Sequence, residues 1–407
     1  MTKAVFICFG ARGQCYANYY FTNKTNFKIQ AVADAKTHLR ELAVNKYGCP
    51  KENCFDDWKK LLSKGVMGDI LFICTQDNFH VEPAIEAIKA GYKNIMVEKP
   101  IDKSIEKCLE LKNTADEYGA NVQVCHSLRY TNFYRTLKSI IDSGVIGKLQ
   151  NINHIETAGT FHYAHNFVRG DWARGDLTSP IILAKCCHDT DLLLWLTGKK
   201  CKTVSSYGSL DYFKKENAPD NAPERCIWGC PVNDSCPYSA IKYLGKYKDQ
   251  IIREYAVEKE GFTSTEEALE KGRYGRCVFY CDNNVADHQT SVIEFEDGIV
   301  ATLTMSAFSN IDRQTHIMGT LGEILADFGN DKIEVFDFKT DSKQTYKIGH
   351  AETLHGGADY NIVSDFIKSI NNSDILYTDI KHSIDSHIMA MAMEESRITG
   401  RPVSVSE

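Results

Sequence analysis

The chain lacks several features that would place it in a broad class of proteins. The apolar run near the N-terminus covers only residues 4–9, which is far too short to span a membrane. That run has no charged leader and no cleavage site, so no export signal is predicted. Internal repeats and low-complexity tracts are also missing. We therefore expect no membrane association and no secretion.

An excess of positive charge is missing too. Lys and Arg number 47 against 54 Asp and Glu, a net charge of −7, so nothing supplies the basic field that phosphate backbones require. Nucleic acid is thus excluded as the expected partner. The 407 residues are 43% hydrophobic and 25% charged, values that are typical of a folded protein with about two domains.

The 15 cysteines do not form a disulfide pattern. Their number is odd, they are scattered, and Cys8, Cys74 and Cys125 lie within apolar runs. Most are expected to be small buried side chains in a reducing compartment, which predicts a cytoplasmic protein.

The first 125 residues alternate between short apolar runs and helix-like stretches at 81–90 and 104–118. Strands that alternate with helices form βαβ units and a parallel sheet. We therefore expect an α/β domain over residues 1–125, with strands at 4–9, 27–33, 69–74, 94–97 and 121–125.

The pattern changes in the second part of the chain. One long helix is predicted over 179–196, and an Asp-Gly pair at 297–298 supplies the positive φ of a hairpin turn. Residues 126–407 are expected to form an α+β domain with an open, mostly antiparallel sheet. A cysteine-rich insertion with one helix at 264–271 interrupts it at about 208–282. Its predicted strands are 291–295, 299–306, 323–327 and 332–336.

The turn after the first strand has the spacing of a dinucleotide-binding loop. Such a loop uses three glycines, for the tight turn, for the approach of the pyrophosphate and for close helix packing. Here the positions hold Cys8, Gly10 and Gly13. Asp34 ends the next strand, where a carboxylate accepts the ribose hydroxyls and repels a 2′-phosphate. This favours NAD over NADP; an ordinary turn and a helix cap at Asp34 are the alternatives.

Two further motifs suggest acid–base chemistry. In Glu98-Lys99-Pro100 the proline ends the strand and fixes Lys99 at the carboxyl edge of the sheet, where an ammonium can stabilise an alkoxide. On the predicted 179–196 helix, Lys185 and His188 are three residues apart and share a face, which makes His188 a candidate general base. A surface lysine and a buried core histidine are the alternatives.

In this order the motifs resemble the Gfo/Idh/MocA family of NAD(P)-dependent oxidoreductases, which act mostly on sugars and cyclitols. The resemblance covers nearly the whole chain except the insertion, and it implies a Rossmann domain followed by an open sheet whose exposed face pairs subunits, as a dimer or tetramer. The motifs are Gly10-Ala11-Arg12-Gly13, Asp34, Thr75-Gln76-Asp77-Asn78-Phe79-His80, Glu98-Lys99-Pro100, Arg129-Tyr130, Gly144-Val145-Ile146-Gly147-Lys148 and Cys187-His188-Asp189-Thr190-Asp191.

The resemblance also implies roles for individual residues. Cofactor contacts are expected from Phe9, Gly10, Ala11, Arg12, Gly13, Asp34, Thr75, Gln76, His80, Glu98 and Lys99, with Arg129 near the nicotinamide. Many dehydrogenases of the family carry an Asp one turn before the histidine, where this chain has Ala184. Lys185 is expected to take over part of its role.

The expected reaction is hydride transfer between NAD and a secondary hydroxyl of a sugar, cyclitol or glycoside. His188 would be the base, Lys99 and Lys185 would stabilise the oxygen, and Arg129, Trp172, Asp189, Lys185 and His188 would bind the substrate.

Two other functions use the same residues. In one, oxidation of a glycoside acidifies a neighbouring C–H bond, and elimination, water addition and re-reduction then cleave the glycoside with NAD retained. In the other, the protein is a non-catalytic sensor that binds NAD. Production of NADH, or release of an aglycone without it, would separate these functions.

The insertion carries its own candidate site. Cys226, Cys230, Cys236 and Cys277 are dense in a polar segment that has little core to fill. Four thiolates could bind a structural zinc ion, with Cys277 as fourth ligand in preference to Cys281. An iron–sulfur cluster, free thiols and a disulfide are the alternatives.

Overall fold

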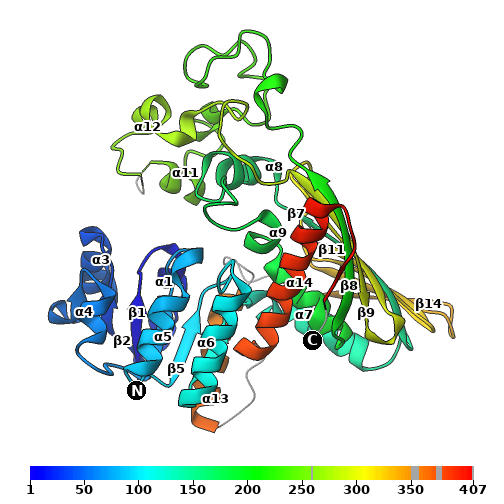
Figure 1. The fold of residues 1–407 in the computed structure, drawn as a ribbon, viewed down its shortest axis with the longest axis horizontal. Coiled ribbons are helices and arrows are strands. Elements are labelled where there is room, and N and C mark those ends of the chain that lie inside the picture. Colours follow the sequence, from blue (N-terminus) through cyan, green and yellow to red (C-terminus); the bar gives the residue numbers. More distant parts are fainter. Residues whose placement is uncertain (258–259, 350–356, 373–377, 406–407) are drawn as a thin grey trace. The chain divides into compact units, whose positions relative to one another are not determined.

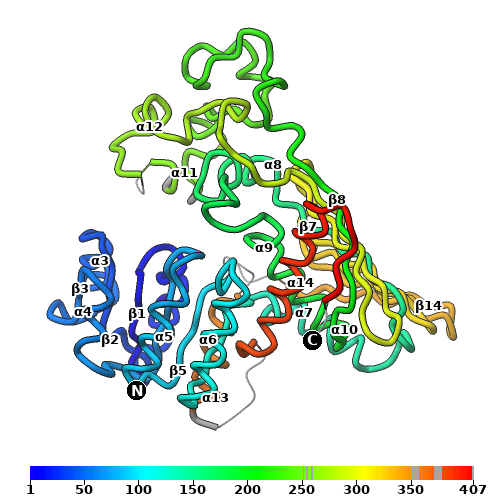
Figure 2. The backbone as a smooth tube through the Cα atoms, in the orientation of Figure 1, coloured from blue at the N-terminus to red at the C-terminus, as the bar shows by residue number. Residues whose placement is uncertain are grey.

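The computed structural model describes residues 1–257, 260–349, 357–372 and 378–405. It consists of two compact units, drawn as a ribbon in Figure 1 and as a backbone trace in Figure 2. The first unit is Met1–Lys148, Cys187–Lys200 and Asp331–Met391, and the second is Leu149–Cys186, Cys201–Asn330 and Ala392–Glu407. Over the described ranges, we find no helix with both the length and the apolar character needed to cross a bilayer.

The first unit contains a parallel sheet of six strands in the order β3-β2-β1-β4-β5-β6, which confirms the predicted α/β class. All five predicted strands are present; β3 was missed because its two residues are too short to give a pattern. The strands are β1 (Thr2–Ile7), β2 (Phe27–Ala33), β3 (Cys54–Phe55), β4 (Ile70–Ile73), β5 (Asn94–Val97) and β6 (Asn121–Val124).

Helices cover both faces of this sheet. On one face, side chains such as Ile7 and Ile73 pack with residues of α5, α6 and α14, and on the other, Phe6 stacks on Phe72 at 4.5 Å among residues of α1, α3 and α13. The strands are therefore apolar on both sides, as parallel strands are. The helices are α1 (Ala11–Ala17), α2 (Tyr19–Thr22), α3 (Thr37–Tyr47), α4 (Trp58–Leu62), α5 (Val81–Lys89), α6 (Ile105–Tyr118), α7 (Asn132–Asp142), α10 (Cys187–Thr197), α13 (Ala358–Asn372) and α14 (Ile380–Thr399).

The carboxyl ends of the parallel strands lie in register. Ile7 pairs with Ala33 on one side and Ile73 on the other, and Ile73 pairs with Val97. The residues that follow these positions are Cys8, Asp34, Cys74, Glu98 and Cys125, and they continue the ladder by one further backbone hydrogen bond each. The loops after these strands therefore meet along one edge, where open α/β sheets bind ligands.

The second sheet has nine strands in the order β14-β13-β12-β11-β7-β10-β9-β8-β15. All its described pairings are antiparallel except β10 with β7, so the predicted open, mostly antiparallel sheet is confirmed. The strands are β7 (Leu149–Thr157), β8 (Cys201–Ser209), β9 (His288–Phe295), β10 (Val300–Ser306), β11 (Gln314–Gly319), β12 (Gly322–Asp327), β13 (Lys332–Asp337), β14 (Ser342–Lys347) and β15 (Val403–Ser404).

One face of this sheet is buried and the other is open. Ile293, Ala301, Ile152, Ile317 and Ile324 form one buried row across five strands. The adjacent row on the opposite face includes Val292 and Leu325, which are 45% and 46% exposed. The predicted hairpin turn is present, since Asp297 and Gly298 both have positive φ.

Two predictions about helices are wrong. The single helix expected over 179–196 is broken into α9 (Ile181–Ala184) and α10, because Lys185 and Cys186 form a turn between them. The insertion holds a second helix, α11 (Ile251–Ala256), besides the expected α12 (Thr265–Lys271), which Ser264 caps. A further short helix, α8 (Thr160–Tyr163), continues into the π-helical turn η4 (Ala164–Arg169).

Candidate active site

The loop after β1 has the backbone of a dinucleotide-binding turn. Cys8 adopts φ +70°, the left-handed conformation for which such loops usually use glycine. A Cβ on Gly13 would lie 2.7 Å from the Cys8 carbonyl oxygen, so this glycine is needed for helix α1 to approach β1. A Cβ on Gly10 would meet nothing within 4 Å. The fold therefore requires Gly13, and it leaves open space at Gly10, where a pyrophosphate would approach.

Asp34 is held against this loop. One carboxylate oxygen accepts a hydrogen bond from the amide of Phe9 at 2.8 Å, and the other accepts one from the amide of Lys36 at 2.8 Å. Helix α3 begins after Lys36, with no side-chain cap. Asp34 therefore ties the end of β2 to the glycine loop, and its contact with a ribose remains a prediction.

Glu98, which is buried, and Arg12, which is partly buried, form a polar cluster with residues of α1 and α13. Arg12 donates to Glu98 at 2.7 Å and to Asp359 of α13 at 2.8 Å, and the hydroxyl of Tyr16 also donates to Glu98. Burial opposes ionisation of Glu98, but Arg12, Tyr16 and Lys99 together lower its pKa. Both predicted cofactor residues thus have protein partners, and they stabilise the first turn of α1.

The loop after β4 is fixed by His80. One ring nitrogen lies 2.8 Å from the carbonyl oxygen of Thr75 and the other lies 2.7 Å from that of Pro100. The Thr75 hydroxyl donates to the carbonyl of Phe79, while Gln76 is exposed. His80 therefore joins the loops after β4 and β5, and cofactor contacts from this loop remain a prediction.

Lys99 and His126 follow neighbouring strands at the same edge. His126 is fully buried, and among the described residues neither of its ring nitrogens has a hydrogen-bond partner. Burial, followed by the charges of Arg129 and Lys99, holds the pKa of His126 well below its usual value. The imidazole is therefore neutral at pH 7 and can both donate and accept a hydrogen bond.

His188 lies in the first turn of α10, next to His126. The two rings meet edge to face, with centroids 5.9 Å apart. His188 is 7% exposed, while the adjacent Asp189 is fully buried. The charge of Lys99 also acts on the Cys187 thiol, where it opposes the rise in pKa to about 12 that burial causes. The two imidazoles therefore lie side by side in the first unit, and the charge of Lys99 acts on His126 and on Cys187.

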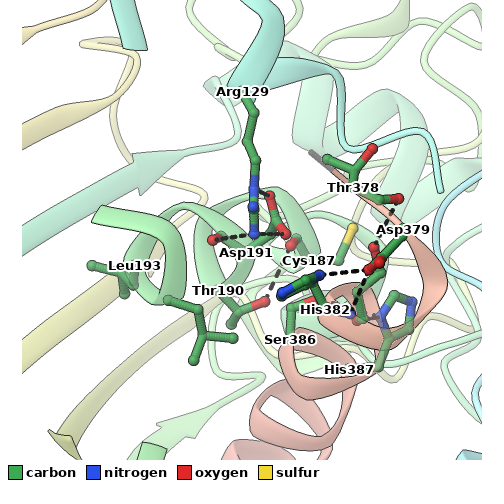
Figure 3. Close-up of polar contacts among 12 residues, drawn as sticks. Arg129, Cys187, Thr190, Asp191, Leu193, Thr378, Asp379, His382, Ser386 and His387 are labelled. Carbon is green, nitrogen blue, oxygen red and sulfur yellow. Dashed lines mark hydrogen bonds and ion pairs between the residues drawn. The ribbon is translucent and has the colours of Figure 1, made fainter. Parts of the chain in front are cut away.

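Helix α10 is anchored by Arg129, which lies in the helical turn η3 (Ser127–Tyr130). Two guanidinium nitrogens donate to the two carboxylate oxygens of Asp191, at 2.7 and 2.6 Å, as Figure 3 shows. The guanidinium also lies 5.5 Å from the ring of Trp195. A bidentate pair of this kind has a fixed geometry, so Arg129 holds α10 and with it His188. Its predicted contacts with nicotinamide and substrate remain predictions.

His387 of α14, which Figure 3 also labels, supports the backbone just after the Glu98-Lys99-Pro100 turn. Its Nε2 accepts a hydrogen bond from the amide of Ile101 at 2.8 Å, and its Nδ1 donates to the carbonyl of Ser383 at 2.7 Å. Burial, with a smaller contribution from His126, lowers the pKa of His387 to about 3. The ring is therefore neutral, with its proton on Nδ1.

Two predicted substrate residues lie in the second unit. The ammonium of Lys185 is 3.2 Å from the buried carboxylate of Glu156 on β7, which also pairs with Arg313 at 2.9 Å. Because the helix is broken after Ala184, the predicted shared helical face of Lys185 and His188 does not exist. Trp172 is half buried and packs near Phe167. Substrate contacts of both residues remain predictions.

The four predicted metal ligands, Cys226, Cys230, Cys236 and Cys277, line one small cavity in the second unit. In the ranges that the structure covers, however, no three or more His, Cys, Asp or Glu side chains are arranged so that they could hold a metal ion. The predicted zinc therefore has no support from the arrangement as it stands.

Sequence reasoning missed the roles of His126, His387 and Asp359. His126 directly follows a predicted strand, and that position could have identified it, as it did for Lys99. Asp359 and His387 come from the last quarter of the chain, and no local pattern marks them.

Comparison with known proteins defines the class to which this fold belongs. The model of an oxidoreductase family with an NAD-binding Rossmann fold matches residues 2–126, and the model of the same family's C-terminal α/β domain matches residues 138–405. The chain therefore belongs to the Gfo/Idh/MocA oxidoreductase family, as the motifs predicted.

Individual relatives are distant. YteT of Bacillus subtilis, named as an oxidoreductase, is 23% identical over 366 residues, 84% of this chain and 82% of that protein. An inositol 2-dehydrogenase of Salmonella typhimurium is 24% identical over 208 residues, 50% of this chain and 57% of that protein. The structure of scyllo-inositol dehydrogenase from Lactobacillus casei with bound NAD(H) and scyllo-inositol has a TM-score of 0.70 at 17% identity, with both chains covered completely.

Proposed function

We propose that this protein is an NAD-dependent dehydrogenase that oxidises a secondary hydroxyl of a sugar, cyclitol or glycoside. The observation that carries the proposal is the edge-to-face pair of His126 and His188, beside which the charge of Lys99 acts on His126. The same edge of the parallel sheet carries the open position at Gly10. The named activities of the relatives, which include inositol dehydrogenases, support the substrate class.

The residues present fit NAD. Gly10 leaves room for a pyrophosphate at the N-terminus of α1, where backbone amides favour negative charge. Asp34, which follows β2 and is bonded to the glycine loop, would accept the hydroxyls of the adenosine ribose. The carboxylate at Asp34 disfavours the additional phosphate of NADP. When bound, NAD supplies the hydride acceptor. We assign this binding to residues 1–125, and substrate binding and assembly to residues 126–407.

The chain's own residues manage the hydroxyl proton and the charge on its oxygen. His188 accepts the hydroxyl proton as the carbinol loses its hydride, so a carbonyl forms and no charge is left on the substrate. Lys99 stabilises the partial negative charge on the oxygen during this step. His126, which is neutral and fully buried, packs edge to face against His188 and would keep that ring in position.

The exposed face of the nine-stranded sheet is the surface where we expect copies of the chain to pair. Tyr207, Val292 and Leu325 expose 67%, 45% and 46% of their surface there. Burial of such a row would be favourable. Light scattering of wild type and of Val292→Lys would test a dimer or tetramer.

The test of the proposed reaction uses the purified protein with NAD and a panel of cyclitols, free sugars and aryl glycosides. NADH absorbance that grows with one of these substrates, and that Lys99→Ala removes, is the expected result. Release of an aglycone without NADH would instead establish the redox-assisted glycosidase. If the protein binds NAD but neither signal appears with any substrate, the protein is a non-catalytic NAD-binding sensor and the proposed reaction is wrong.

A further inference from the structure

Four cysteines of the second unit surround one small cavity. Cys226, Cys230, Cys236 and Cys277 all line it, together with Arg169. The cavity has a volume of about 10 Å³, close to what one water-sized sphere needs. The fifth cysteine of the segment, Cys281, is not among the lining residues, and its thiol donates to the carbonyl of Cys277 at 3.3 Å.

The backbone brings these cysteines together from two separate stretches. Arg225 and Arg276 form an antiparallel bridge, in which the Cys226 amide donates to Gly275 at 3.1 Å and the Cys277 amide donates to Glu224 at 2.8 Å. In this bridge Cys226 lies opposite Gly275, and Cys277 is two residues from Gly275. Residues opposite each other, or two apart on one strand, share a face, so Cys226 and Cys277 lie on the same side of the bridge.

The turn that carries the other two cysteines folds back onto the first. The side-chain amide of Asn233 donates to the carbonyl of Cys226 at 2.9 Å, and the backbone amide of Cys236 donates to Val232 at 2.8 Å. Three parts of a segment with few regular elements thus meet at the cavity.

Arg169 supplies a second, independent observation. It is 3% exposed; it donates from Nε to the Arg276 carbonyl and from Nη2 to the Tyr238 carbonyl, both at 2.7 Å, and Nη2 lies 4.0 Å from the sulfur of Cys226. Its Nη1 is buried without a hydrogen-bond partner. In the described ranges no carboxylate lies within ion-pair distance of it. A buried cation without a counter-charge is costly, so the cavity lacks an anion.

Neutral thiols do not supply that charge, whereas metal-bound thiolates do. We propose that Cys226, Cys230, Cys236 and Cys277 bind one zinc ion as thiolates, with Arg169 offsetting the charge of the site. Binding releases four protons, and four thiolates around Zn²⁺ carry a net charge of −2. Because no metal-binding arrangement exists among the described side chains, the thiols must turn inward about their single side-chain torsion.

The test measures metal content of the full-length protein, purified without chelator and then supplied with Zn²⁺. We expect about one zinc per chain in the wild type and less than about a tenth of that in Cys230→Ser and Cys277→Ser. Cys281→Ser, the matched control from the same segment, should keep its zinc. Arg169→Met should weaken zinc binding at least about tenfold in competition with a chelator, the usual effect of removing a group that supports the ligands.

A measurement on the wild-type chain covers the case in which the serine variants do not fold. Replacement of the zinc by Co²⁺ should give thiolate-to-cobalt charge-transfer bands and the visible bands of a tetrahedral site. A folded protein that takes up neither metal would overturn the proposal. So would an equal loss of zinc in Cys281→Ser, or iron with visible absorbance in place of zinc.

Discussion

Arg12, which is partly buried, and Arg169, which is fully buried, both lie in polar surroundings, but only Arg12 has its counter-charges. Arg12 lies between Glu98 and Asp359, at 2.7 and 2.8 Å. Arg169 has backbone carbonyls, a nearby thiol and, among the residues described, no carboxylate. The comparison indicates that a cluster in which every charge has a counter-charge supports the fold. A buried charge without a counter-charge indicates a missing ligand.

The same distinction, between side chains with protein partners and positions without them, applies at the carboxyl edge of the parallel sheet. Glu98, Arg12 and His80 all have protein partners, so they shape the loops of the edge. Gly10 has open space beside it instead, and it marks where the cofactor is expected. The two ring nitrogens of His126 are buried and have no hydrogen-bond partner among the described residues.

The largest expected effect is the difference in stability between variants of the two arginines. Arg12→Met leaves Glu98 and Asp359 without their cation and should lower the free energy of unfolding by about 3 kcal/mol or more. In metal-free protein, Arg169→Met removes an uncompensated charge and two hydrogen bonds, so it should cost no more than about 2 kcal/mol. Urea unfolding of both variants measures the difference, and equal losses would refute the comparison.

Next come the residues of the proposed chemistry. Lys99→Ala and His188→Ala should each reduce turnover at least about a hundredfold, because each removes an oxyanion-stabilising or acid–base group. Steady-state kinetics with the substrate found in the panel gives the values. Lys89→Ala, on the exposed surface of α5, is the control. Near-normal turnover in His188→Ala would place the base elsewhere.

The neutral His387 predicts a dependence of stability on pH. Its pKa is about 3 in the folded protein and about 6.5 in an unfolded chain, so between these values the unfolded state binds the extra proton. Stability should therefore fall as pH drops below about 6.5, by about 1.4 kcal/mol per pH unit for this group. Urea unfolding at pH 7, 6 and 5 tests this. In His387→Gln the slope of the unfolding free energy against pH should be smaller by the contribution of one proton. An unchanged slope would contradict the lowered pKa of His387.

The smallest effect concerns Cys8. Its φ of +70° costs about 1 kcal/mol for a residue with a Cβ, and glycine adopts it freely. Cys8→Gly should therefore raise the free energy of unfolding by up to about 1 kcal/mol, whereas Cys8→Val should lower it. Thermal unfolding distinguishes the two. A loss of stability in Cys8→Gly would show that the partly buried thiol contributes more to stability than the strain costs.

Much of the first unit could be predicted from the sequence because its strands are buried on both faces and appear as apolar runs. The residues that follow those strands could then be placed at one edge. The ion pair between Arg12 and Asp359 could not be predicted, since the two residues are 347 positions apart in the sequence. The break at Lys185 and Cys186 was missed because neither proline nor glycine marks it. In the second sheet, β8 was missed because its sequence is polar.

NAD titration and unfolding of two glycine variants test most directly whether the loop after β1 binds the cofactor. Gly10→Ala places a methyl group in open space, so it should change stability by less than about 1 kcal/mol yet weaken NAD binding at least about tenfold. Gly13→Ala, whose Cβ would lie 2.7 Å from the Cys8 carbonyl oxygen, should lose both stability and binding. If Gly10→Ala binds NAD as tightly as the wild type, the loop after β1 does not hold the pyrophosphate and the account is wrong.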